Sequence, residues 1–227
     1  MPAAPFDPQP IYLSLRVALG ALTIVAVLGT LAGRFFSIRR FRGQGFLEAL
    51  LLLPLVLPPV VSGFALLVLL GRRGVVGAWL WRVFEAQLLF TPFAATLASA
   101  LVAFPLMFAS ARSAFAGVDV ELEYAAASLG ATPARVFWTV ALPLAGPGVV
   151  MGALLAFLRA LGEFGATVLV AGNIAGQTTT ISTAIYMAAE DGDLALAGRY
   201  CAVLVALNFV FVLLAQTVAP RFGRHSR

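Results

Sequence analysis

The chain has 227 residues, of which 61% are hydrophobic and only 11% charged, and its mean hydropathy is +0.99. Because a soluble domain is roughly 45–50% apolar, this composition excludes a soluble globular protein and indicates an integral membrane protein. All 15 basic residues are arginines, and they form no stripe interleaved with aromatic residues. We therefore expect no nucleic-acid partner and attribute the net charge of +5 to membrane topology and anionic lipid head groups.

The sequence offers no pattern for a disulfide, a metal or a nucleotide. Cys201 is the only cysteine and lies in an apolar run, so no disulfide can form within the chain. His225 is the only histidine, and no set of residues has metal-ligand spacing. A phosphate-binding loop of the form GxxxxGK[ST] is absent from the sequence. We expect this chain to bind no cofactor itself.

The N-terminal part predicts a first membrane span and its orientation. Residues 1–10 are rich in proline and lack basic residues, and we expect them to form an extracytoplasmic leader. Residues 11–33 carry one charge, Arg16, and are long enough to cross the membrane. The loop that follows is basic, with Arg34, Arg39, Arg40 and Arg42. By the positive-inside rule this loop is cytoplasmic, which puts the N-terminus outside.

Further apolar runs predict four more membrane spans, at residues 46–70, 92–111, 144–172 and 200–220. The segments 71–90 and 173–193 would lie on the extracytoplasmic side of the membrane. The first of them would follow the membrane surface, with Trp79, Trp81 and Phe84 as an interfacial aromatic belt.

These runs predict an all-α integral membrane fold of about five transmembrane helices in a single domain, residues 11–220. A basic cytoplasmic tail, residues 221–227, would follow. With this topology nine arginines lie inside and five outside, while Arg159 falls within the membrane. The excess on the inside is the bias that the positive-inside rule requires.

The predicted span 46–70 contains Pro54, Pro58 and Pro59 and must therefore be kinked or broken. Each proline removes a backbone donor and clashes with the preceding turn, and in lipid the freed carbonyls need other partners. Two interpretations remain open. Pro58, Pro59 and Ser62 either line a solvated translocation pathway or belong to a kink that serves helix packing alone.

The predicted span 144–172 carries two charges, Arg159 and Glu163, four residues apart on one helix face. They can neutralise each other where a single charge would cost about 2.5–3.5 kcal/mol. The small residues Gly165 and Thr167 follow, and they permit either close helix contact or the passage of a solute. The four residues are candidates for the translocation pathway or its gate, and the alternative is an ion pair that only orients the helix.

Segment 117–144 interrupts the apolar runs with polar and small residues. Asp119 is suited to cap a short helix whose first turn carries Glu121 and Glu123, and Gly130 is suited to end it.

A second short helix is predicted directly after this glycine. Thr132 is a suitable N-cap and Pro133 a suitable first helical residue, and the helix would run to Pro143. A helix, a glycine corner and a helix would present a knob of side chains on the cytoplasmic side while both ends stay anchored in the membrane. Such a unit is suited to receive force from another protein.

This segment resembles the cytoplasmic loop of the membrane subunits of ATP-binding-cassette importers, which reads EAA, three residues, Gly, nine residues, Ile-x-Leu-Pro. The alanines, the glycine and the closing positions match at Ala125, Ala126, Gly130, Val140, Leu142 and Pro143. Tyr124 occupies the glutamate position, so the salt link or cap of that carboxylate would have to come from Glu123, one residue earlier. The resemblance implies that ATPase coupling involves Glu123, Tyr124, Ala125, Ala126, Gly130, Ala131, Arg135, Val140, Leu142 and Pro143.

Over nearly its whole length the chain is similar to molybdate importer permeases, through residues 53–80, 117–144 and 157–181. Sulfate permeases share much of the last segment. The resemblance implies the type I importer permease fold, a homodimer in a bacterial-type cytoplasmic membrane, and alternating access. It also implies two cytoplasmic ATPase subunits that bind ATP and Mg²⁺ and contact residues 123–143, and an extracytoplasmic binding protein that delivers the oxyanion to residues 71–90 and 173–195.

The sequence leaves other functions to be weighed. Within the same family the anion could be sulfate or tungstate. A secondary transporter driven by an ion gradient would use Glu163 as its proton carrier. An intramembrane enzyme would have to build its site from Glu163, Arg159 and Asn173, which include no paired carboxylate, nucleophile or metal set. We therefore expect a transport subunit and not an enzyme.

Overall fold

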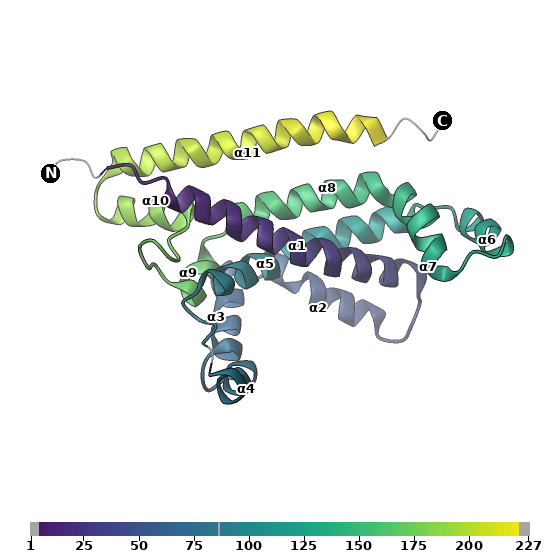
Figure 1. The fold of residues 1–227 in the computed structure, drawn as a ribbon, viewed down its shortest axis with the longest axis horizontal. Coiled ribbons are helices and arrows are strands. Elements are labelled where there is room, and N and C mark those ends of the chain that lie inside the picture. The colour runs from purple at the N-terminus through teal and green to yellow at the C-terminus, as the bar shows by residue number, and fades with distance from the viewer. Residues whose placement is uncertain (1–4, 86, 223–227) are drawn as a thin grey trace.

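The computed structural model describes residues 5–85 and 87–222, apart from the side chains of residues 215 and 217–222. In this part of the chain every regular element is a helix (Figure 1). The elements are α1 (Gln9–Ile38), α2 (Gln44–Val56), α3 (Pro59–Leu70), α4 (Val75–Phe84), α5 (Pro92–Ala116), α6 (Val120–Ser128), α7 (Pro133–Val136), the π-helical segment η1 (Phe137–Ala141), α8 (Leu142–Leu161), α9 (Gly165–Ala171), α10 (Ile181–Glu190) and α11 (Leu194–Phe222).

Four helical stretches are long and apolar enough to cross a membrane, and α2 with α3 makes a fifth if this bent pair counts as one span. The four are Gln9–Ile38, Pro92–Ala116, Pro133–Leu161 and Leu194–Leu214. The prediction of about five membrane helices is therefore confirmed.

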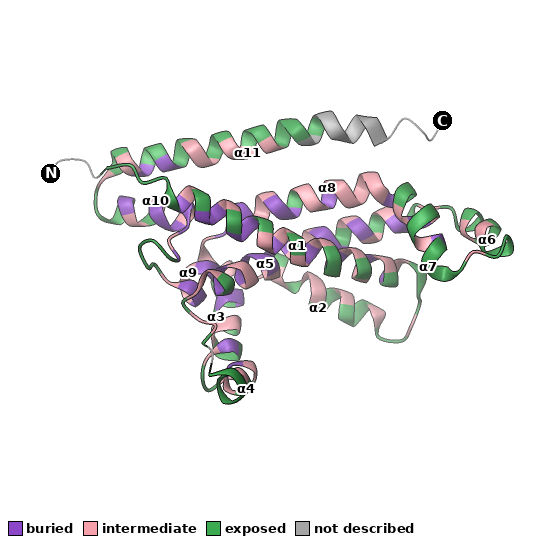
Figure 2. Ribbon diagram, viewed as in Figure 1, coloured by how far each residue is buried: buried purple, intermediate pink, exposed green. Residues whose placement is uncertain are grey.

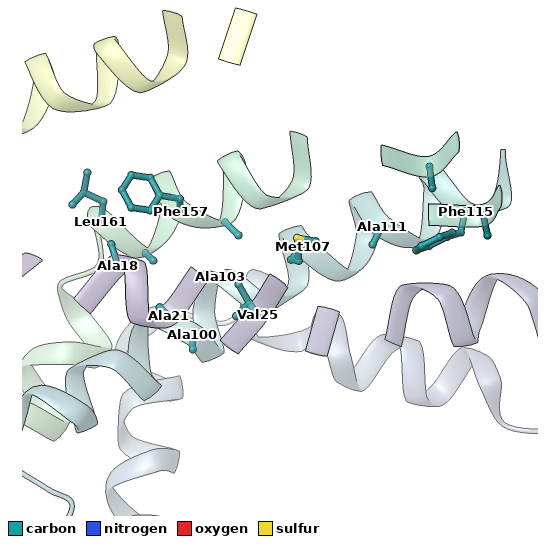
Figure 3. Close-up of a cluster of buried hydrophobic side chains, with 14 residues drawn as sticks. Ala18, Ala21, Val25, Ala100, Ala103, Met107, Ala111, Phe115, Phe157 and Leu161 are labelled. Atoms are coloured by element: carbon teal, nitrogen blue, oxygen red, sulfur yellow. The ribbon is translucent and has the colours of Figure 1, made fainter. Parts of the chain in front are cut away.

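The centre of the molecule is a bundle of α1, α5 and α8 (Figure 1). Small residues let these helices approach closely: a Cβ on Gly33 of α1 would lie 2.7 Å from the Cβ of Ala111 on α5, and one on Gly152 of α8 would lie 2.6 Å from the Cβ of Ser110. The core between them consists largely of alanines, with Met107 and a few larger side chains (Figure 3). Close contact between small residues is the usual way in which helices associate in lipid.

Two of the central helices are longer than predicted. α1 continues to Ile38 and α5 to Ala116, so Arg34 and Arg112 lie within helices and not in the loops to which the sequence assigned them. Both arginines form ion pairs with other elements, Arg34 with Glu123 and Arg112 with Glu48. Because arginine is a good helix former, these contacts are made without ending the helix.

The predicted span 46–70 is broken, as its prolines indicated. Pro54 lies inside α2, and the break falls at Leu57 and Pro58, after which Pro59 opens α3. The axes of α2 and α3 differ by 111°. Figure 1 shows α3 leaving the bundle sideways, with α4 at its far end.

The prediction of one continuous span over residues 144–172 was wrong. α8 ends at Leu161, and α9 begins at Gly165 after a short non-helical connection. The reason is local: Glu163 lies in the connection, and its carboxylate accepts a hydrogen bond from the backbone N–H of Ala166 at 2.8 Å. A side-chain acceptor at this place satisfies a donor of the new helix, which favours a restart over continuation.

The second helix of segment 117–144 does not end at Pro143, contrary to the prediction. α7 passes through η1 into α8 without interruption, giving a helical stretch from Pro133 to Leu161. In η1 the N–H of Leu142 bonds to the carbonyl of Phe137, a wider turn than in an α-helix. This change of register immediately precedes Pro143, the residue without an N–H, and the helix continues through it.

At the opposite end of the bundle the chain forms a small hydrogen-bonded cap. Helix α1 already begins at Gln9, inside the predicted leader, and Tyr200 of α11 donates to the carbonyl of Asp7 at 2.9 Å. Ser14 accepts a hydrogen bond from the N–H of Ile181, at the start of α10 within the predicted outer segment. Residues 1–4 of the predicted leader and residues 223–227 of the predicted tail, which include His225, lie outside the described residues.

Candidate coupling and translocation sites

The first half of the candidate coupling site is α6, whose two ends are defined by side chain and backbone. Asp119 accepts a hydrogen bond from the N–H of Glu121 at 2.9 Å and so caps the helix, as predicted. At the other end Gly130 has a φ of +86°, a left-handed conformation that favours glycine. The N–H of Ala131 reaches back to the carbonyl of Ala126 at 3.1 Å and closes the corner.

The second half begins at once and leads directly into the membrane. Thr132 accepts a hydrogen bond from the N–H of Arg135 at 3.4 Å, and Pro133 is the first residue of α7, both as predicted. α7, η1 and α8 are continuous, so a single helical stretch connects Pro133 with Leu161.

The candidate coupling segment, residues 117–144, is largely exposed at the end of the bundle where α6 lies, as the ribbon coloured by burial shows (Figure 2). No residue of α6 is buried. Tyr124 is 67% exposed, Leu129 90% and Trp138 65%. Of the predicted coupling residues, those exposed are Tyr124, Ala125, Gly130, Arg135 and Pro143, and those of intermediate exposure are Glu123, Ala126, Ala131, Val140 and Leu142. Large apolar side chains with this exposure are typical of a contact surface.

Glu123 faces the bundle, where Arg34 of α1 binds it with both arms of the guanidinium. Arg34 Nη1 lies 2.9 Å from Glu123 Oε1, and Nη2 pairs with Oε2. The motif of the importer loop implies a salt link from its glutamate position, which Tyr124 occupies here. In this chain the link is made by Glu123, one residue earlier. Sequence reasoning assigned Arg34 only to topology, since nothing in the spacing of residues 34 and 123 indicates that they meet.

A second ion pair lies at the same end of the bundle. Arg112 of α5 binds Glu48 of α2 at 2.8 Å, and Gln44 donates both to Glu48 at 2.7 Å and to the carbonyl of Phe36 at 3.2 Å. This network ties the short helix α2 to the two long helices beside it.

The candidate pathway residues Arg159 and Glu163 form the expected ion pair, but across the break between α8 and α9 and not along one helix. Arg159 Nη1 lies 2.7 Å from Glu163 Oε2. The Glu163 side chain is only 1% exposed, whereas that of Arg159 is 29% exposed. The pair therefore presents its positive member outward and buries its negative member.

The other candidate pathway residues meet where α3 crosses α9. Gly63 of α3 touches the backbone of α9 so closely that a Cβ there would lie 2.6 Å from the Cα of Ala166, and one on Gly165 would lie 3.2 Å from the Cβ of Pro59. The hydroxyls of Ser62 and Thr167 are buried beside this contact and have no hydrogen-bond partner. The two helix breaks, at Pro58 and at Glu163, thus adjoin the same crossing.

At the end of the bundle opposite to α6, the N-terminal segment, the start of α1, the 173–180 loop and helices α10 and α11 line an open cavity of about 210 Å³. Asp7, Gln9, Asp191 and Tyr200 contribute its polar lining. Gln9 also donates to the carbonyl of Gly176 at 3.2 Å, which ties α1 to the outer loop. Among the described residues no group of three or more His, Cys, Asp and Glu side chains is placed to hold a metal.

Comparison with known proteins agrees with these features. Residues 26–224 match the family described as binding-protein-dependent transport system inner membrane component. The permease protein YvgM of Bacillus subtilis is 44% identical over 91% of each chain, and the molybdenum transport system permease protein ModB of Escherichia coli is 42% identical over 93% of each. The sulfate transport system permease protein CysT of Escherichia coli is 33% identical over 93% of this chain and 76% of its own length.

Solved structures show the same fold at low sequence identity. A chain of the inward-facing MetNI methionine ABC transporter superposes with a TM-score of 0.75 at 15% identity, covering 96% of this chain and 97% of its own. A chain of the bacterial alginate ABC transporter, solved with a periplasmic protein bound to an alginate pentasaccharide, gives a TM-score of 0.75 at 16% identity over 97% and 81% of the two chains. The fold is that of type I ABC importer permeases, and the chain belongs to the family of binding-protein-dependent transport system inner membrane components.

Proposed function

We propose that this chain is the permease subunit of an ATP-driven importer that carries molybdate, or a similar tetrahedral oxyanion, across the cytoplasmic membrane. The observation that carries the proposal is the similarity to ModB of Escherichia coli, which extends over 93% of both chains and so includes both helix breaks and the coupling segment. A sulfate permease is the alternative within the family, because CysT is also similar but less so and over a smaller share of its length.

The remaining parts of the importer belong to other chains. Two cytoplasmic ATPase subunits bind ATP and Mg²⁺ and dock on residues 123–143, where exposed Tyr124, Leu129 and Trp138 support a protein contact. This chain then performs no catalysis. A second copy completes the pathway along a two-fold axis, which the few membrane helices of one chain support. An extracytoplasmic binding protein delivers the anion to residues 71–90 and 173–195.

The orientation follows from the basic residues. The end of the bundle that carries Arg34, Arg112 and the coupling segment is cytoplasmic, and the N-terminus lies outside. The chain returns to the cytoplasm through α11, so its C-terminus lies inside.

The geometry suggests how ATPase closure moves the gate. α7, η1 and α8 form one helical stretch of 29 residues. At 1.5 Å per residue such a lever is about 43 Å long. It ends at the break that holds Arg159 and Glu163, beside the crossing of α3 and α9. Rocking of this lever separates or closes the crossing, where Ser62, Gly165, Thr167 and the Pro58–Pro59 turn lie, and so opens or shuts the pathway.

The lining needs only weak attraction for the anion. Arg159 supplies positive potential, while Glu163 offsets it at close range. An anion that is held weakly leaves as readily as it enters, whereas tight capture is the task of the binding protein.

Anion competition in cells tests the substrate. In bacteria that lack their own molybdate and sulfate permeases, the chain is expressed with its ATPase and binding-protein partners. Uptake of radiolabelled molybdate is measured with excess unlabelled sulfate or tungstate, and uptake of radiolabelled sulfate with excess unlabelled molybdate. We expect restored molybdate uptake that sulfate leaves intact. Restored sulfate uptake, with molybdate neither carried nor competing, would contradict the molybdate assignment and favour the sulfate alternative.

A further inference from the structure

Helix α6 is held in place by very little packing. None of its residues is buried, although it forms half of the segment on which the proposed ATPase acts. Its covalent links to the membrane helices run through Gly117 to α5 and through the Gly130 corner to α7. Without a side-chain contact to the membrane helices, α6 could swing about these two connections, and force applied to it would reach the bundle only through α7.

The Arg34–Glu123 ion pair removes this freedom. It joins the first turn of α6 to the last turns of α1, with each arm of the guanidinium on one carboxylate oxygen. The two side chains are only 14% and 16% exposed, so water screens the pair little. The guanidinium carbon also lies 5.5 Å from the ring centroid of Phe115, a buried residue near the end of α5. A two-point contact over an aromatic ring fixes orientation as well as distance.

We infer that Arg34 is a positioning residue of the transport cycle, which transmits displacement of α6 to α1 and thereby to the α1–α5–α8 bundle. The inference rests on the proposed function, since it needs an ATPase that moves the coupling segment. Force then enters the bundle at two places, through α7 into α8 and through Arg34 into α1. Both helices would move together as a rigid unit, because α1 and α8 share the core around Ala21, Met107 and Phe157 (Figure 3).

The chain contains a matched control at the same end of the bundle. Arg112 and Glu48 also form an ion pair, at 2.8 Å, but they join two membrane helices, α5 and α2, and do not touch the coupling segment. The Arg112 side chain is 39% exposed. Arg112→Gln therefore removes one arginine charge and one ion pair without releasing α6.

The first test uses the whole importer in proteoliposomes and measures anions transported per ATP hydrolysed. A coupling free energy of 1–3 kcal/mol predicts that Arg34→Gln and Glu123→Gln each lower this ratio by about tenfold. ATPase binding to the permease should be retained in both, and the charge swap Arg34→Glu with Glu123→Arg should restore most of the ratio. Arg34→Lys should restore little, because an ammonium cannot make the two-armed contact. Arg112→Gln should leave the ratio near the wild-type value.

Two results would overturn the inference. An Arg34→Gln importer with an unchanged ratio would show that α6 transmits force without the pair. Loss of ATPase binding in Arg34→Gln would show that the pair shapes the docking surface instead of passing movement inward.

The second test is independent of the anion and of the ATPase. Spin labels are placed at the exposed positions Ile38 and Leu129 of the full-length permease in lipid, and the distribution of distances between them is measured. We expect one narrow distribution in the wild type and in Arg112→Gln, a broad one in Arg34→Gln, and a narrow one again in the charge swap. An equally narrow distribution in Arg34→Gln would refute the inference even if the importer carries molybdate, whereas failure of the proposed function would leave this readout unchanged.

Discussion

Glu163 is the one charged residue that is buried in the part of the chain that the structure describes. Its carboxylate serves two partners at once: Oε2 binds the guanidinium of Arg159 at 2.7 Å, and Oε1 accepts the N–H of Ala166 at 2.8 Å. The sequence predicted the ion pair from the spacing of four residues. It did not predict the cap, because an i,i+4 pair is also what a continuous helix would show.

Substitutions of Glu163 separate these two roles. Glu163→Gln keeps an acceptor for Ala166 but leaves Arg159 unpaired, which we expect to lower the free energy of unfolding by about 1–3 kcal/mol. Glu163→Ala also removes the helix cap and should cost roughly 1 kcal/mol more. Thermal unfolding of the purified permease should therefore give the highest midpoint for the wild type, a lower one for Glu163→Gln and the lowest for Glu163→Ala. The variant Glu121→Gln, which changes an exposed glutamate, should unfold close to the wild-type midpoint. Equal midpoints for all four proteins would contradict this role of Glu163.

Transport by the same Glu163→Gln protein bears on mechanism. A proton carrier at this position requires a titratable side chain, and glutamine has none. Normal uptake by Glu163→Gln would rule out the proton-carrier alternative together with any essential electrostatic gate at this residue.

At the scale of elements, the sequence was most informative where a residue has one dominant backbone effect. Pro58 and Pro59 correctly indicated the break between α2 and α3. Asp119 and Gly130 correctly bounded the first short helix, and Thr132 the start of the second. The break after Leu161 was missed because the run from 144 to 172 is apolar and contains no proline near its break. The break coincides with two short-range contacts of Glu163, to Arg159 and to the N–H of Ala166, and the spacing of these residues is equally compatible with a continuous helix.

Pro143 shows the opposite error. A proline inside a helical pattern usually ends or kinks the helix, and the sequence was interpreted in that way. The structure keeps the helix by inserting η1 before the proline. Contacts of this stretch with the bundle support the unusual turn: Ala141 is fully buried in the central core, and the ring of Phe137 lies 6.0 Å from that of Phe115.

The Gly130 corner is the element whose backbone conformation is best suited to test. An added Cβ would meet nothing within 4 Å, so any effect of substitution arises from the φ of +86° alone. We expect Gly130→Asn to be tolerated, because asparagine adopts the left-handed conformation readily. Gly130→Ala should raise the free energy of this corner conformation by about 1–2 kcal/mol, and Gly130→Val should distort the corner. Co-purification of the ATPase should fall in that order and uptake with it, while membrane insertion stays intact.

Gly146 provides the control for this series, since it also has open space around a Cβ but lies in α8 without a positive φ. Gly146→Val should bind the ATPase like the wild type. Full ATPase binding and uptake by Gly130→Val would mean that the shape of the corner is not needed for coupling.

At the scale of the whole molecule, the exposed candidate coupling segment lies at one end of the bundle. The helices α3 and α9, each of which begins after a helix break, cross nearer the other end. The number of spans could be predicted from hydropathy. The side on which they begin, which the arginine positions indicate, stays a prediction. The crossing of α3 with α9, and the ion pair between Arg34 and Glu123, could not be predicted, because both depend on residues far apart in the sequence.

In the proposed mechanism energy conversion takes place outside the chain, in an ATPase that acts on segment 117–144. The most direct measurement compares two energy sources in proteoliposomes that contain the permease, its ATPase and its binding protein, and follows uptake of radiolabelled molybdate. We expect uptake with ATP, none when the ATPase is replaced by a variant that binds but does not hydrolyse ATP, and none from an imposed proton gradient alone. Uptake driven by the gradient in the absence of the ATPase would contradict the importer mechanism and identify the chain as a secondary transporter.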